Sequence, residues 1–148
     1  MSSETKVGLF SALSCLLAPF LCRVPGGAAW FGQYLPSNNV SFGGFLLILG
    51  FSAIPSFVVL VAGLFSKKPY YFPILGSLPI ALFSLCYWHR SNDLSADAQA
   101  AISLVMIPIS TAILATGGAI LGLGIQCLVG RLQSGAEQDA ALKSQGVE

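Results

Sequence analysis

Long apolar runs separated by short polar segments dominate the sequence. They cover residues 7–24, 42–66, 70–88 and 101–130, and the second carries no charge from Phe42 to Ser66. As a helix, that second run is ~37 Å long at 1.5 Å per residue, which exceeds the ~30 Å hydrocarbon core of a bilayer. A soluble domain of 148 residues does not need four such runs. The pattern predicts an all-α integral membrane protein, a four-helix bundle that forms a single domain over residues 1–148.

Every predicted span contains proline, and the fourth is rich in glycine. A proline inside a helix removes one N–H donor and leaves a carbonyl without its helical partner. We expect kinked helices whose free carbonyls are satisfied by packing. The alternative is a set of broken helices that line a transport path. The prolines concerned are Pro19, Pro55, Pro73, Pro79 and Pro108.

Gly118 and Gly122 form a G-x-x-x-G pair in the fourth span. Such a pair lets a second backbone approach closely. We expect it to pack against another helix of the same chain. Contact with a second copy, or with another membrane protein, is the alternative. Gln126 is the only amide inside a span, and we expect it to hydrogen-bond a neighbouring helix.

The basic residues indicate the orientation of the chain. Four spans place both termini on one side, and five of the seven basic residues then share that side (Lys6, Lys67, Lys68, Arg131 and Lys143). Arg23 and Arg90 lie on the other side. The positive-inside rule therefore predicts a multi-pass protein of the plasma (inner) membrane with both termini cytoplasmic. Residues 131–148 are expected to form a polar cytoplasmic tail, either a frayed helix or disordered.

The first run has a second interpretation, as a cleaved signal peptide that follows Lys6. A retained helix is favoured because the run is longer than the apolar region of a usual signal. Arg23 also stands where a signal peptide would carry small neutral residues.

Composition narrows the possible partners. The chain is 55% hydrophobic and 9% charged, against ~25% charged residues in typical soluble domains. Its net charge is +1, and the basic residues are scattered rather than clustered. A nucleic-acid partner is therefore excluded, because phosphate binding needs a concentrated basic surface. The lipid bilayer is the one partner that the composition requires.

Residues that support catalysis or bind metals are sparse. No Asp, Glu, Lys or Arg occupies the middle of a predicted span, which argues against a proton-coupled pump. His89 is the single histidine and stands beside Arg90 at a membrane boundary, so a bis-histidine haem or a metal cluster has no partners. The sequence predicts no catalytic, cofactor-binding or metal-binding residue, and the protein is not expected to be an enzyme.

The four cysteines contain no C-x-x-C motif. Cys22 ends the first span and Cys86 nearly ends the third, so both are expected near the outer surface. They can form a disulfide in an oxidising compartment if the two helices adjoin, and otherwise serve as small packing residues. In the connection between the first two spans, Trp30, Phe31 and Tyr34 are expected to form an interfacial aromatic belt, with a re-entrant stretch as the alternative.

Three functions remain open. The first is a structural or assembly component of a membrane complex, which the lack of chemical motifs favours. The second is a small-solute transporter or channel subunit, in which Ser110, Thr111 and Thr116 would face the path. The third is a membrane thiol/disulfide redox protein that uses Cys22 and Cys86.

Overall fold

The chain folds into helices. A computed structural model describes residues 3–36, 41–94 and 99–144. Within these ranges there are five α-helices, one 3₁₀ helix and no strand. In chain order they are α1 (Ser3–Leu21), η1 (Val24–Gly26), α2 (Ala28–Gly32), α3 (Phe42–Phe65), α4 (Phe72–Ser91) and α5 (Gln99–Ser144).

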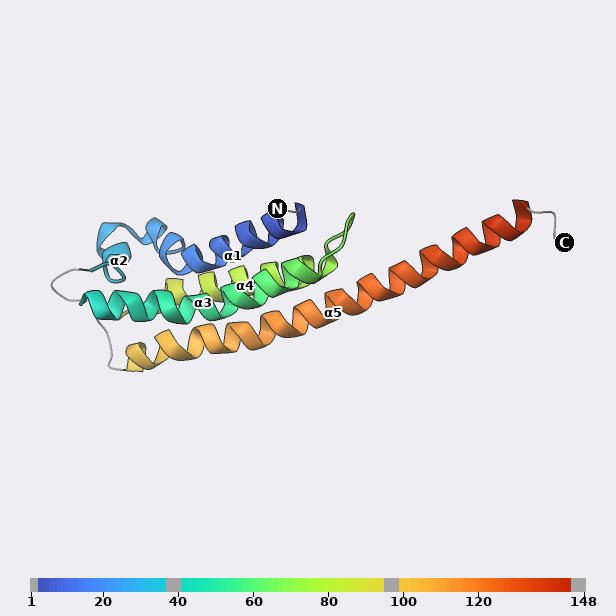
Figure 1. Ribbon diagram of the computed structural model, residues 1–148. Coiled ribbons are helices and arrows are strands. Elements are labelled where there is room, and N and C mark those ends of the chain that lie inside the picture. Colours follow the sequence, from blue (N-terminus) through green and yellow to red (C-terminus); the bar gives the residue numbers. More distant parts are fainter. Residues whose placement is uncertain (1–2, 37–40, 95–98, 145–148) are drawn as a thin grey trace.

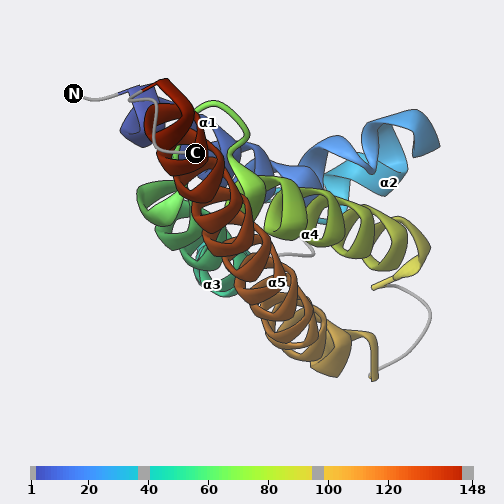
Figure 2. The same cartoon turned by 90° about the vertical axis from the view of Figure 1, so that its right-hand side faces the viewer.

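The four long helices lie side by side as a bundle (Figures 1 and 2). Among the described residues, four segments are long and apolar enough to cross a membrane: Ser3–Gly26, Phe42–Phe65, Phe72–Ser91 and Ile102–Gln138. These segments overlap the four predicted runs, and the predicted all-α fold is confirmed. Their length and composition are those of a multi-pass helical membrane protein.

Both termini lie towards the same end of the bundle (Figure 1). α1 begins beside the α3–α4 connection, and α5 passes this end and continues well beyond it. The opposite end holds η1, α2 and the start of α5. This antiparallel arrangement agrees with the four predicted spans, which place both termini on one side.

Glycines allow the helices to touch backbone to backbone. A Cβ on Gly118 would overlap the carbonyl oxygen of Gly76, and a Cβ on Gly122 would overlap that of Phe72. Gly8 of α1 meets Gly63 of α3 in the same way. The Gly118/Gly122 face predicted for close approach is therefore already covered by α4 of the same chain.

Buried hydroxyl groups are hydrogen-bonded within the bundle. The hydroxyls of Ser52 and Ser56 donate to the carbonyls four residues earlier, at 2.7 and 2.8 Å. Ser84 of α4 and Thr111 of α5 share a buried hydrogen bond of 2.8 Å. In a hydrocarbon solvent each unsatisfied polar group would cost several kcal/mol, so these bonds make the small polar residues compatible with the bundle interior.

α5 is much longer than a membrane span. Its 46 residues extend ~69 Å, more than twice the thickness of the hydrocarbon core. The helix continues through Arg131, where the fourth predicted run ends, and reaches Ser144. Residues 131–144, called the C-terminal arm below, are thus a continuation of the membrane helix rather than a separate tail.

Candidate functional site

A fully buried arginine lies at the end of the bundle opposite the termini. Arg23 directly precedes η1 and is 0% exposed. Its Nε donates to the carbonyl of Trp30 at 3.0 Å, and its Nη2 donates to Oε1 of Gln33 at 2.6 Å. Its Nη1 donates to the carbonyls of His89 and Asn92 at 2.6 and 2.7 Å. One guanidinium thus joins the segment after α1, the α2 region and the end of α4.

Two aromatic rings enclose the same guanidinium. Its central carbon lies 4.4 Å from the ring centroid of Trp30 and 4.1 Å from that of Tyr34, within the range of cation–π contacts. The chain turns back towards Arg23 at Gly27, whose φ of +88° favours a residue without a side chain. The positive charge is therefore surrounded by carbonyl oxygens and π faces.

Tyr34 and His89 form a buried pair beside the arginine. The hydroxyl of Tyr34 lies 2.8 Å from Nδ1 of His89, and the rings meet edge to face. Burial raises the pKa of Tyr34, and the nearby Arg23 charge acts in the opposite direction. The phenol is consequently protonated at neutral pH. Nε2 of His89 is buried without a hydrogen-bond partner in the described part of the chain.

An amide links the arginine to a carboxylate. Gln33 donates from Nε2 to Oδ1 of Asp93 at 2.9 Å, while its Oε1 accepts from Arg23 and, at 3.3 Å, from the backbone N–H of Leu94. The Gln33 side chain therefore lies between the Asp93 carboxylate and the Arg23 guanidinium and bonds to both. We call Arg23, Trp30, Gln33, Tyr34, His89, Asn92 and Asp93 the arginine cluster.

The arginine cluster acts as a clamp, which here means a set of hydrogen bonds that holds two parts of the chain together. Four of the five guanidinium N–H groups donate to acceptors from two distant parts of the chain. No group of three or more His, Cys, Asp or Glu that could hold a metal ion occurs in residues 3–36, 41–94 and 99–144. The cluster fixes the α1–α2 connection against the end of α4.

Sequence analysis missed this cluster, and its prediction for Tyr34 was wrong. A belt residue faces the membrane interface, whereas Tyr34 is 0% exposed and Trp30 stacks on Arg23. The available signal was a charge at the end of an apolar run, followed by Trp30, Gln33 and Tyr34. The carbonyl acceptors on α4, 66 and 69 residues further on, leave no trace in the side-chain pattern.

The structure places Cys22 and Cys86 at one groove. They border the same groove, about 650 Å³ in volume, between the segment that follows α1 and the end of α4. The Cys22 thiol lies 3.5 Å from the carbonyl of Pro19. Both are free thiols in the structure.

The hydroxyls considered for a transport path do not share one groove. Ser110 borders a groove of about 480 Å³ between α4 and α5. Thr111 is 0% exposed and bonded to Ser84. Thr116 borders a different groove, between α3 and α5, and donates to the carbonyl of Ala112 at 2.7 Å.

Gln126 connects α5 to the end of α3. Its Nε2 donates to the carbonyl of Phe65 at 3.0 Å, and its Oε1 accepts from the backbone N–H of Lys67 at 2.8 Å. The prediction that this amide bonds a neighbouring helix is confirmed. It satisfies two backbone groups that the end of α3 leaves free.

Four spans, one buried clamp and a projecting helix define a small polytopic membrane protein. No protein-family model matches the chain, and no curated protein or solved structure shows significant similarity to it.

Proposed function

We propose that the protein is a structural or assembly component of a membrane complex, and that it is not an enzyme. We place it in the plasma (inner) membrane with both termini in the cytoplasm, on the distribution of basic residues. The C-terminal arm then extends into the cytoplasm.

The observation that carries this proposal is the exposure of the C-terminal arm. Side chains from Arg131 to Gln138 are all exposed, and Leu132 is 66% exposed. Helices of this length are marginal in water unless another surface packs against them. A partner that covers one side of the arm would supply the missing packing.

One side of the arm suits such a partner. Leu128, Leu132, Ala136 and Ala140 follow one another at intervals of four residues, so they form a ridge along one face of α5. All four side chains are exposed. Ser134 and Gln138 lie on the opposite face and are also exposed. The apolar ridge is the contact surface that the proposal assigns.

We expect the double variant Leu132→Glu/Ala136→Glu to release the protein from its complex. Two carboxylates on the ridge would have to be desolvated in the interface, whereas both residues are compatible with a helix. The matched control, Ser134→Glu/Gln138→Glu, adds the same charges at the same spacing on the opposite face. The measurement is the size and composition of the particle extracted in mild detergent at native expression level.

The expected pattern is a complex of defined stoichiometry for the unmodified chain and the control, and a smaller particle for the ridge variant. A lone monomer for the unmodified chain would contradict the assembly role. An intact complex in the ridge variant would contradict the assigned surface.

A second candidate function, thiol/disulfide redox chemistry, is favoured by the position of Cys22 and Cys86 on the same groove. Oxidation would join the two sulfurs and release two protons and two electrons to an oxidant such as a quinone or diamide. The bond requires the two Cα atoms to lie within about 7 Å of each other.

Treatment of the membrane-embedded protein with diamide is expected to form the Cys22–Cys86 disulfide. Peptide mass spectrometry with and without reductant would show the linked peptides, and Cys22→Ser would abolish them. Cys127, an exposed cysteine of α5 that does not border this groove, serves as the control. Free thiols at both positions after oxidation would end this candidate.

A further inference from the structure

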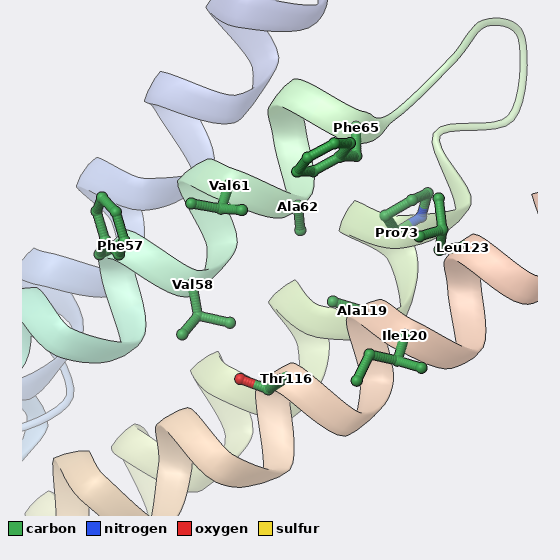
Figure 3. A pocket seen from close by; sticks show the side chains of 10 residues that line it. All are labelled: Phe57, Val58, Val61, Ala62, Phe65, Pro73, Thr116, Ala119, Ile120 and Leu123. Carbon is green, nitrogen blue, oxygen red and sulfur yellow. The ribbon is translucent and has the colours of Figure 1, made fainter.

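The grooves of the bundle differ in what they can hold, and one is almost purely hydrocarbon. It lies between α3 and α5 near the end that carries the termini (Figure 3). Side chains from the two helices face each other across it, and Pro73 at the start of α4 closes one end. The residues that line it are Phe57, Val58, Val61, Ala62, Phe65, Pro73, Thr116, Ala119, Ile120 and Leu123.

The groove offers no free hydrogen-bonding group among these side chains. Thr116 is the single polar residue, and its hydroxyl already donates to Ala112. The volume is about 270 Å³. That is roughly nine times the ~30 Å³ share of one liquid water, and a methylene is of similar size. The space therefore accepts part of one acyl chain rather than a polar solute.

Positive charge lies directly beyond the groove. Phe65 is the last residue of α3, and the exposed Lys67 and Lys68 follow in the connection to α4. Gln126 holds this connection against α5 through the backbone N–H of Lys67. The two exposed lysines therefore directly follow the end of the groove that Phe65 lines, where the apolar helix ends and lipid headgroups are expected.

We propose that this groove binds one acyl chain of an anionic phospholipid, whose phosphate is held by Lys67 and Lys68. The hydrocarbon lining selects a chain, and the two lysines select a negative headgroup. None of the residues that line the groove belongs to the apolar ridge of the C-terminal arm, so this test does not depend on the proposed assembly role.

The test is native mass spectrometry of the full-length protein, released from detergent after equilibration with phosphatidylglycerol or with phosphatidylcholine of identical acyl chains. We expect one phosphatidylglycerol to be retained per protein, with an affinity about 10- to 30-fold higher than that of phosphatidylcholine, from two lysines near the headgroup. The double variant Lys67→Gln/Lys68→Gln should reduce phosphatidylglycerol binding to the level of phosphatidylcholine.

A second variant tests the acyl-chain part of the site. Ala119→Phe fills the groove from α5 and should lower the retention of both lipids. Ala53→Phe, at an exposed position outside the groove, is its matched control. Lys6→Gln/Arg131→Gln is the control for charge, because it removes two basic residues near the same membrane surface.

Equal retention of the two lipids by the unmodified protein would overturn the proposal, as would a lysine variant that binds phosphatidylglycerol normally. A dimer that Ala119→Phe abolishes, with lipid retention unaffected, would assign the groove to a second copy and would also overturn it. Because the lysine variant alters only exposed side chains, its result stands even if Ala119→Phe fails to fold.

Discussion

Arg23→Met is expected to destabilise the folded protein by about 3–5 kcal/mol, the range for removing one member of a buried charged network. The substitution leaves four acceptors without their donor, among them the carbonyls of His89 and Asn92. It also removes the cation from the Trp30 and Tyr34 rings. Unfolding in mixed micelles, followed by the tryptophan fluorescence of Trp30 and Trp88, would measure the loss.

Two further variants distinguish the clamp from a general effect of charge. Arg90→Met removes an exposed arginine from the same end of the bundle and should cost less than about 1 kcal/mol. Arg23→Lys keeps the charge but cannot reach the same acceptors in a fork, so an intermediate loss is expected. If Arg23→Met and Arg90→Met behaved alike, the clamp would have no energetic role.

Gly118→Leu is expected to separate α4 from α5 and to cost about 3 kcal/mol or more, the upper end for overpacking. The first added atom already overlaps the Gly76 carbonyl, which belongs to the backbone and cannot rotate away. The expected result is loss of the Ser84–Thr111 contact. It would be seen as loss of disulfide cross-linking between cysteines introduced at these two positions.

The same helix supplies the controls for this substitution. Gly117 and Gly124 have open space where a Cβ would lie, so Gly117→Leu and Gly124→Leu should leave the bundle intact. All three changes add the same apolar side chain to the same helix. Equal effects at Gly117 and Gly118 would show that close approach to α4 is not needed.

The spans could be predicted from the sequence because the bilayer imposes a length. In hydrocarbon, a single run such as residues 42–66 is stable only as a helix, because a helix hydrogen-bonds its own backbone N–H and C=O groups. The close approach of another helix at Gly118 and Gly122 could also be predicted, because two glycines four residues apart leave a groove on one helix face. Gln126 was predictable on the same ground, because an amide inside a span needs a partner.

The arginine cluster could not be predicted because its acceptors are mostly backbone carbonyls. Any residue at position 89 or 92 would present the same carbonyl oxygen, so the amino-acid types there carry no signal for the hydrogen bonds to Arg23. Arg23 was assigned by its charge to a membrane surface. The fold instead returns the chain at Gly27 and closes the aromatic rings of Trp30 and Tyr34 over it.

The sequence left open whether the arm is a frayed helix or disordered. Gly130, Ser134 and Gly135 are weak helix formers, and the segment has no continuous apolar stripe wide enough to require a helix. In the structure the arm inherits its helical phase from the membrane span that precedes it. A helix that is already nucleated extends at little cost, whereas one that starts in water does not.

Because α5 is one uninterrupted helix, the C-terminal arm has a fixed length and a fixed orientation relative to the membrane span. Residues 131–144 span ~20 Å of helix. A partner bound at the far end of the arm is therefore held at that distance from Arg131. Any rotation of the span within the lipid turns the outer end through the same angle. One residue inserted near Arg131 would turn that end by ~100° relative to the bundle and lengthen it by only ~1.5 Å.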